Sequence, residues 1–267
     1  MFPYTTVTLS AGLKKFATAA AAADSGDSQA IVVAPSRPTF TAWEVGSVRL
    51  VNRSGSVALV GLGVRYANSA WVAGQVTSAG AYTDATAAAQ ETTTNDVTLY
   101  NHLITDGNGF LVGATELWNL LALIGSTAGN QTTPALKLEA WTGAAWLDIT
   151  GAILYQDNLV TGTGEKLILF ARPANWVKGG SGTNVPQTTY NLRVTFTTAG
   201  QGTTDPLASQ LFVGMARFLT DAVADGAQAA FPQQPAVRFP KVGAALHPLF
   251  TVAALDNYCE VQYRSYQ

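Results

Sequence analysis

Two neighbouring stretches decide the fold class that the sequence predicts. Residues 164–176 read GEKLILFARPANW, and residues 190–196 read YNLRVTF. Both apolar runs are short, and Pro173 and Trp176 lie between them. Short apolar runs bounded by turn residues are typical of β-strands, and proline, which has no N–H group, ends strand pairing. This part of the chain therefore predicts a strand, a turn and a second strand, with Trp176 closing a core.

Segments of the same kind recur on both sides of these stretches. Residues 116–124 also have apolar side chains at helical spacing, but their β-type surroundings favour a strand. Turn residues separate the segments at the intervals that a sandwich requires, so we expect an all-β fold with a jelly-roll-like β-sandwich. Further strands are expected at residues 48–51, 57–60, 96–104, 110–112, 135–141, 145–150, 211–219 and 258–263.

Two connections have a distinctive composition. Residues 52–55, Asn-Arg-Ser-Gly, are typical of a hairpin loop in which Gly55 takes a positive φ. Residues 74–94 are rich in alanine, threonine and glycine and contain few core-forming side chains. We therefore expect a β-hairpin around Gly55 and a long loop, with a short turn at Asp84, over residues 74–94.

The chain is expected to have three parts: an N-terminal arm at residues 1–45, a sandwich body at 46–220 and a C-terminal extension at 221–267. Residues 1–9 alternate apolar and hydroxyl side chains, which favours an extended segment docked on a neighbouring molecule. Residues 11–23 are rich in alanine and favour a short helix. Interruption of strand pairing is expected at the prolines of the extension, Pro232, Pro235, Pro240 and Pro248.

Composition narrows the class of protein. Charged residues make up 12 % of the chain, about half of the roughly 25 % that is usual in soluble domains. A surface with so few charged residues favours burial against many copies of another molecule, as in a structural component of a large assembly. The formal charge of −2 argues against nucleic-acid binding, which needs a basic surface. Without a signal sequence or an apolar run of about 20 residues, a soluble protein made in the cytoplasm is expected.

Residues that could carry chemistry are few. His102 and His247 lie far apart, which does not support a zinc site, and His247 is expected in a loop because Pro248 follows it. Asp148, Asp157 and Glu165 leave open a carboxylate pair of the kind that cleaves glycosidic bonds. The single cysteine, Cys259, excludes an internal disulfide. We expect no enzymatic activity, no cofactor and no metal.

Five segments between residues 82 and 194 combine turn residues with aromatic side chains. They are Tyr82-Thr83-Asp84 with Thr86 and Gln90, DGNGFLVG at 106–113, EAWTGAAW at 139–146, RPANW at 172–176 and YNLRV at 190–194. Together they resemble a module of structural proteins in tailed bacteriophages. The resemblance implies a β-sandwich in a virion without enzymatic activity, and leaves open whether it lies on the head, neck or tail.

The leading hypothesis is a capsid decoration or cement protein that braces the major capsid protein, is synthesised in the host cytoplasm and forms homo-oligomers. The alternative is a tail, neck or spike component that binds host carbohydrate through exposed aromatic side chains, with Trp71 and Trp118 as candidates. In the leading hypothesis the two ends of the chain cross subunit boundaries. Candidate contact residues are Phe2, Tyr4, Leu13 and Phe16 at one end, and Tyr258, Tyr263 and Tyr266 at the other.

Overall fold

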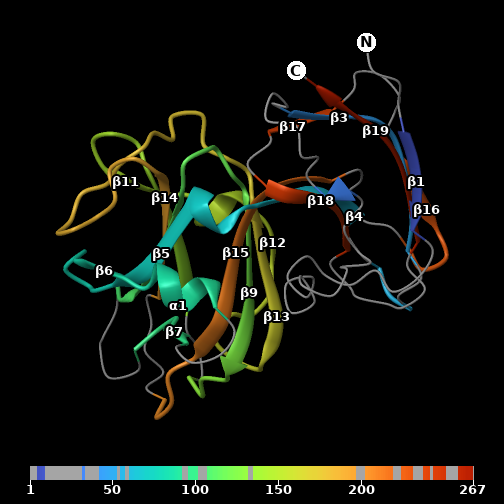
Figure 1. Cartoon of the computed structure of the whole chain (residues 1–267). Coiled ribbons are helices and arrows are strands. Elements are labelled where there is room, and N and C mark those ends of the chain that lie inside the picture. Colours follow the sequence, from blue (N-terminus) through green and yellow to red (C-terminus); the bar gives the residue numbers. More distant parts are fainter. Residues whose placement is uncertain are drawn as a thin grey trace. The chain divides into compact units, whose positions relative to one another are not determined.

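The computed structural model is mostly β, with antiparallel sheets (Figure 1). The chain divides into two compact units, residues 68–213 and residues 1–67 together with 214–267. The structure describes residues 5–9, 32–33, 42–52, 55–57, 60–91, 96–101, 107–131, 135–196, 202–218, 224–230, 237–240, 243–250 and 258–266.

The unit of residues 68–213, called here the sandwich unit, contains two sheets. The six-stranded sheet has the order β11 (Trp146–Asp148), β10 (Leu136–Trp141), β14 (Tyr190–Phe196), β8 (Gly109–Ala114), β5 (Trp71–Val76), β6 (Tyr82–Asp84). The second sheet has the order β12 (Ile153–Gln156), β13 (Gly164–Phe170), β9 (Leu120–Thr127), β15 (Leu207–Phe218), and β7 (Val97–Thr98) also pairs with β15. Short helices are α1 (Thr86–Gln90), η1 (Asn68–Ala70) and η2 (Thr150–Ala152).

Aromatic side chains tie the two sheets of this unit together. The Trp118 indole is fully buried, with its ring centroid 5.4 Å from that of Phe170 on β13 and 5.5 Å from that of Trp176. Its Nε1–H donates a hydrogen bond of 2.8 Å to the carbonyl oxygen of Tyr190 on β14. The Trp176 indole is also buried and donates to the Asn191 carbonyl oxygen at 3.0 Å. The predicted strand, turn, strand and closing tryptophan are therefore confirmed.

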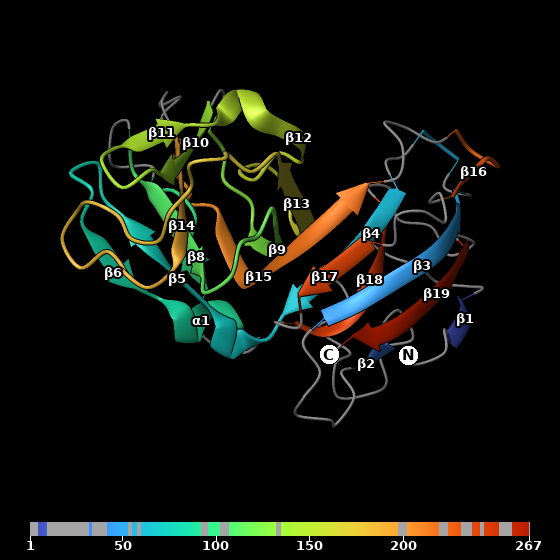
Figure 2. The ribbon, with the colours of Figure 1, turned by 90° about the horizontal axis from the view of Figure 1, so that it is seen from above.

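The second unit, called here the terminal unit, is built from both ends of the chain. Its five-stranded sheet has the order β1 (Thr5–Leu9), β19 (Tyr258–Tyr266), β3 (Ala42–Val51), β16 (Gln228–Ala230), and β17 (Val237–Pro240) also pairs with β3. Figure 2 shows β3 and β19 side by side. In the other sheet, β4 (Val60–Tyr66) lies between Gly214–Phe218 of β15 and β18 (Gly243–Phe250), and β2 (Val32–Val33) pairs with β18.

The strand predictions agree with the structure at most positions. Strands β8, β10, β11, β13, β14, β15 and β19 overlap the segments expected for them. Residues 116–124 do contain a strand, but β9 begins at Leu120 and continues to Thr127. The expected strand at residues 96–104 is short, since β7 covers Val97–Thr98.

The hairpin prediction around Gly55 is wrong. Gly55 does take a positive φ of 75°, but β3 and β4 belong to different sheets. One edge of β3 is occupied by β19 and the other by β16 and β17, so β4 has no free edge to pair with. The turn is instead attached to residues near 226: the Asn52 N–H donates to the Ala227 carbonyl, and the Gly55 N–H donates to Asp225 Oδ1 at 2.9 Å.

The long loop predicted over residues 74–94 is also wrong. This region contains the end of β5, all of β6 and helix α1. Small residues mark close strand pairing here, because a Cβ atom at Gly74 would overlap the carbonyl oxygen of Thr83 on the neighbouring strand. The scarcity of large side chains therefore reflects tight packing of backbones.

Two of the C-terminal prolines lie in strands, and His247 lies in β18 rather than in a loop. Pro240 is the last residue of β17, which pairs with β3 alone among the described strands. Pro248 lies in β18 beyond Ala245 and Leu246, the residues paired with β2. A proline is tolerated where its missing N–H group faces no partner strand. Pro232 and Pro235 lie outside the described residues.

The observed units divide the chain differently from the expected arm, body and extension. The divisions fall after Ala67 and after Val213, so the strands of residues 42–66 group with the two chain ends. The cause is strand pairing, since β3 pairs with β19 and β4 pairs with β18. Residues 5–9 are extended, as expected, and they pair with β19 of the same chain. The helix expected at residues 11–23 lies outside the described residues.

Candidate functional site

A charged and aromatic cluster lies on one face of the six-stranded sheet. Strand register places Glu139 of β10 opposite Arg193 of β14, and Trp141 opposite Trp146 of β11. The Arg193 Nε and Nη2 atoms both lie 2.7 Å from Glu139 Oε2, and Lys137 Nζ lies 2.7 Å from Oε1. The Arg193 guanidinium also covers the Trp146 ring, 4.8 Å from its centroid. We call these residues the Trp–Arg–Glu cluster.

The buried carboxylate of this cluster is electrostatically matched. Glu139 is only 4 % exposed, and an isolated charge at that depth would be costly. Two cationic side chains and charge-assisted hydrogen bonds offset that cost. Because the guanidinium is engaged by both the carboxylate and the Trp146 ring, the cluster can fix the positions of β10, β11 and β14 relative to one another.

Residues 177–189 form a loop that packs on the same face. Val185 is buried with Val76, Tyr82 and Leu111, and Trp146 packs against this group. The Trp146 Nε1–H donates to the Ser181 carbonyl oxygen at 3.2 Å. The sheet therefore has a second, smaller apolar core beneath the loop, on the side that carries the Trp–Arg–Glu cluster.

Asn191 fastens this loop to β14. Its side-chain amide is fully buried and donates to the carbonyl oxygens of Gly179, at 2.9 Å, and Pro186, at 2.6 Å. The Thr189 hydroxyl donates to Asn191 Oδ1 at 2.7 Å. A Cβ atom at Gly113 on the neighbouring strand would overlap that oxygen, so only glycine leaves room for the amide.

Tyr82, Asp84 and Thr86 form a compact hydrogen-bonded group at β6 and α1. The Tyr82 hydroxyl donates to Asp84 Oδ1 at 3.0 Å, the Thr86 hydroxyl donates to the same oxygen at 2.6 Å, and the Ala73 N–H donates to the Thr86 hydroxyl at 3.0 Å. Partial burial raises the pKa of Asp84, but the hydrogen bonds from Thr86 and Tyr82 outweigh it, so the pKa lies below its usual value. Burial and Asp84 raise the pKa of Tyr82. At neutral pH the group is therefore a charged acceptor with two neutral donors.

The structure brings together four of the five segments on which the expected bacteriophage resemblance rests; the fifth, residues 172–176, lies between β13 and β14. Tyr82 and Asp84 lie on β6, residues 109–113 on β8, residues 139–146 on β10 and β11, and residues 190–194 on β14. All of these strands belong to the six-stranded sheet. Their distinctive side chains make the ion pair, the loop fastening and the small second core. Within the described residues, these four segments therefore make packing contacts around one sheet.

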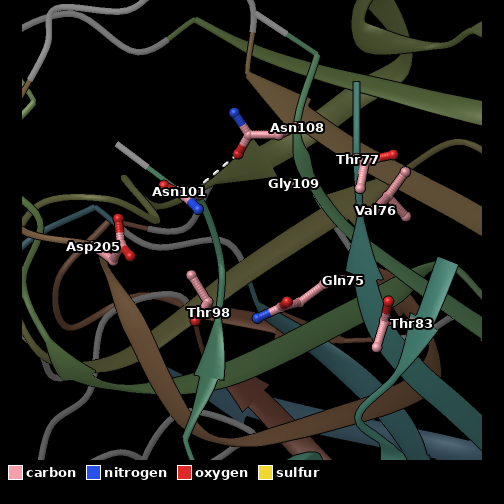
Figure 3. A pocket seen from close by; sticks show the side chains of 9 residues that line it. All are labelled: Gln75, Val76, Thr77, Thr83, Thr98, Asn101, Asn108, Gly109 and Asp205. Carbon is pink, nitrogen blue, oxygen red and sulfur yellow. Dashed lines mark hydrogen bonds between the residues drawn. The ribbon is translucent and has the colours of Figure 1, made fainter. Parts of the chain in front are cut away.

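A polar pocket of about 120 Å³ lies elsewhere on the sandwich unit (Figure 3). Three amide side chains, three threonines and the Asp205 carboxylate line it, and Figure 3 shows the Gln75 amide extending toward Thr98. The Asn101 N–H donates to Asn108 Oδ1 at 2.9 Å at its rim. Its lining residues are Gln75, Val76, Thr77, Thr83, Thr98, Asn101, Asn108, Gly109 and Asp205.

Sequence analysis did not find this pocket, because its lining comes from separate segments that strand pairing joins. Only the glycine-rich turn at residues 107–109 was a signal in that region. Hydroxyls, amides and a carboxylate are the groups that bind saccharide hydroxyls by hydrogen bonds, so the pocket can receive a small polar ligand.

Several large apolar side chains are exposed on the sandwich unit. Leu154 on the edge strand β12 is 56 % exposed, and Leu147 lies on the edge strand β11 of the other sheet. Leu117 and Val177 are exposed as well. Edge strands with apolar side chains are surfaces on which another polypeptide can pack.

The expectation that Trp71 and Trp118 are exposed and contact carbohydrate is wrong. Trp71 is 2 % exposed and Trp118 is fully buried, so neither indole face can receive a sugar. The expected contacts Phe2, Tyr4, Leu13 and Phe16 lie outside the described residues. Tyr258, Tyr263 and Tyr266 lie on β19, where the register places them opposite Val51, Val45 and Ala42 of β3.

The three acidic residues considered for glycoside cleavage are engaged locally. Asp148 Oδ1 accepts the Thr150 N–H at 2.9 Å, which lowers the pKa of Asp148. Asp157 accepts the Tyr155 hydroxyl at 2.7 Å and the Leu167 N–H at 2.8 Å. Burial, followed by the Asp157 hydrogen bond and the charges of Asp157 and Glu165, raises the pKa of Tyr155. Asp148 ends a strand of the six-stranded sheet, whereas Asp157 follows β12 of the other sheet.

Comparison with protein-family models gives no match, and a search of curated proteins finds no significantly similar sequence. Within the described residues, no helix has the length and apolarity to cross a membrane. Over the same part of the chain, no three acidic, histidine or cysteine side chains gather as metal ligands.

Proposed function

We propose that this chain is a non-enzymatic structural protein of a tailed-bacteriophage virion, serving as a decoration or cement protein on the capsid. The observation that carries the proposal is the convergence of four of the five resembling segments on one sheet. There they form an ion pair, a loop fastening and a small second core. These contacts build a rigid binding body, which is what a protein that braces a shell requires.

The surface of the sandwich unit supports the same proposal. Its exposed apolar side chains on β11 and β12 lie on sheet edges, in a chain with few charges to oppose packing. In this role each copy buries a modest apolar area against the major capsid protein. Burial gains about 25 cal/mol per Å², and attachment at many points of a lattice multiplies it into stable binding.

Three finer features belong to the proposal. The body has jelly-roll-like connections, which is supported by the chain passing from β8 to β9 in the other sheet and back to β10. The chain forms homo-oligomers in the virion after synthesis in the host cytoplasm. Its two ends, with the aromatic residues named above, take part in contacts between subunits.

Substitutions on the apolar edges test the docking surface. The double variant Leu147→Ser with Leu154→Ser is expected to lose most binding to purified shells, because both side chains are exposed and contribute little to the fold. Val57→Ser is the matched control, since Val57 is 62 % exposed and lies in the terminal unit. Full binding by the double variant in a co-sedimentation assay would contradict docking through these edges.

A second candidate function is a tail, neck or spike component that binds host carbohydrate. The polar pocket of Figure 3 favours it, with Gln75 and Thr83 in place of the buried tryptophans as contacts. A glycan array should then show binding that Gln75→Ala removes and Gln187→Ala, an exposed glutamine outside the pocket, does not.

The copy number in purified particles decides between the two. A decoration protein is expected at on the order of hundreds of copies per particle, because its binding depends on a repeated lattice. Quantitative mass spectrometry of the encoding phage measures this number directly. A dozen or fewer copies would favour the tail, neck or spike, and absence from the particle would overturn both candidates.

A further inference from the structure

Strand β1 is attached to the terminal unit through one neighbour. Five register pairs join it to β19, from Thr5 opposite Tyr263 to Leu9 opposite Cys259. It lies at the end of the five-stranded sheet and pairs with no other described strand. The other side of β19 pairs with β3 from Tyr258 to Tyr266. The edge of β19 that receives β1 is therefore held in place independently of β1.

The chain between β1 and the next described strand is long. Residues 10–31 separate β1 from β2, and a chain of that length can reach roughly 70 Å when extended. The entropic cost of joining two points grows only slowly with such a length. The connection therefore places little restriction on which β19 edge the strand can meet.

We propose that β1 exchanges between copies of this chain, so that β1 of one copy completes the five-stranded sheet of a second copy. The same five register pairs form in the closed and the exchanged arrangement, so strand pairing does not distinguish them. Exchange of an identical element is a low-cost route to an oligomer. The balance then depends on the concentration of neighbouring copies against the effective concentration within one chain, which is about millimolar for short flexible linkers and lower for longer ones.

This inference goes beyond the proposed function, because its partner is a second copy of the chain and its geometry does not depend on a virion. A dense array of copies, such as a capsid surface, would supply the local concentration that favours exchange. Repeated exchange from one copy to the next would join neighbours without any new interface.

The register provides a direct test. Leu9 lies opposite Cys259, the single cysteine of the chain. Directly opposed residues of antiparallel strands have Cβ atoms about 4.5–5.5 Å apart, close enough for a disulfide after small adjustments. In the variant Leu9→Cys, closed molecules form the disulfide within one chain, whereas exchanged molecules form it between chains. Non-reducing electrophoresis separates the two products.

Purified full-length Leu9→Cys is oxidised at about 1 µM, below the millimolar upper value of the effective concentration, and at about 1 mM, where copies of the chain compete with it. We expect intramolecular disulfides at the low concentration, and covalent multimers at the high one in at least about tenfold excess over two controls. One control is Thr8→Cys, which lies opposite Glu260 and, by the alternation of residues along a strand, on the other face from Leu9. The other is Leu9→Cys with Cys259→Ser.

Intramolecular disulfides alone at both concentrations would overturn the exchange, and so would the absence of any register-specific disulfide. If Leu9→Cys does not fold, the pair Val7→Cys and Val261→Cys in a Cys259→Ser background repeats the test two register pairs away on the same face. The experiment uses purified protein alone, so its result stands apart from the copy-number measurement that tests the proposed function.

Discussion

The strands of the two units find their partners in different parts of the sequence. All strand partners of the six-stranded sheet come from the continuous segment 71–196. In the terminal unit, each described strand from the N-terminal side pairs only with strands that follow residue 206: β1 with β19, β2 with β18, β3 with β16, β17 and β19, and β4 with β15 and β18. The six-stranded sheet of the sandwich can therefore form from segments that lie close together in the sequence, whereas the terminal unit depends on both ends of the chain.

The largest expected effect on the terminal unit is that of removing β19. Deleting residues 258–267 takes away the strand between β1 and β3, so we expect complete loss of the terminal unit and survival of the sandwich. Trp43 lies in β3, and the other five tryptophans lie in residues 68–213. Near-UV circular dichroism during thermal melting should retain the transition of the sandwich. Loss of both units in one step would show that they are a single cooperative body.

Within the sandwich, Trp118→Ala should have the largest effect of a single substitution. The variant loses a fully buried indole and its hydrogen bond to Tyr190, and truncation of a buried tryptophan costs about 3–5 kcal/mol. The midpoint of urea unfolding should fall accordingly, without a change in the signal from Trp43. Trp118→Phe, which keeps a ring against Phe170, should cost less than the alanine variant. An unchanged midpoint for Trp118→Ala would contradict its place between the sheets.

Asn191→Ala should loosen the small core beneath residues 177–189 and leave the main core between the two sheets intact. The amide holds the carbonyl oxygens of Gly179 and Pro186, and leaving such buried groups unpaired costs about 2–3 kcal/mol. Hydrogen exchange should quicken in residues 179–189 while β9 and β13 keep their protection. Thr188→Ala is the control, because Thr188 is exposed on the same loop and should change stability by less than about 0.5 kcal/mol. Uniform loss of protection across the unit would argue against a separate small core.

The smallest expected effect is a pH dependence at β6. The pKa of Asp84 in the folded protein lies below the ordinary value of 3.8, so its charge stabilises the fold above about pH 4 and this contribution disappears as pH falls through the lowered pKa. Wild type should exceed Asp84→Asn at pH 7 by at most about 1 kcal/mol, since solvent screens an exposed carboxylate. Denaturant unfolding should show this difference vanishing by about pH 2. A difference that grows in acid would mean that the sign is wrong.

The sandwich was largely predictable from its sequence because its strands carry local signals. The apolar runs before Phe170 and Phe196 and the tryptophan between them were sufficient to predict two strands and a core contact. Strands β5 and β6 were missed because their close pairing requires small residues such as Gly74, and local composition does not distinguish these from loop residues. The sequence shows that these residues are small, but the reason, close approach of the partner strand, appears only in the folded structure.

The terminal unit and the candidate sites were less predictable, since they depend on long-range register. The turn at Gly55 was recognised, but no local signal showed that β19 and β16 would occupy both edges of β3. Burial of Trp71 and Trp118 likewise follows from tertiary packing, so an aromatic residue alone could not be assigned to a sugar-binding surface. The polar pocket arises only when the segments that carry Gln75, Thr98 and Asp205 are brought together.

The origin of the partners of β3 and β4 has a consequence for biosynthesis. A ribosome completes these two strands early, yet the last fifth of the chain, which supplies their described partners, is translated afterwards. Residues 68–213 emerge in between and can fold as soon as they leave the exit tunnel, since domains generally fold as units during synthesis. The nascent protein thus carries four described strands, β1 to β4, whose partners have not yet been translated when the sandwich is complete.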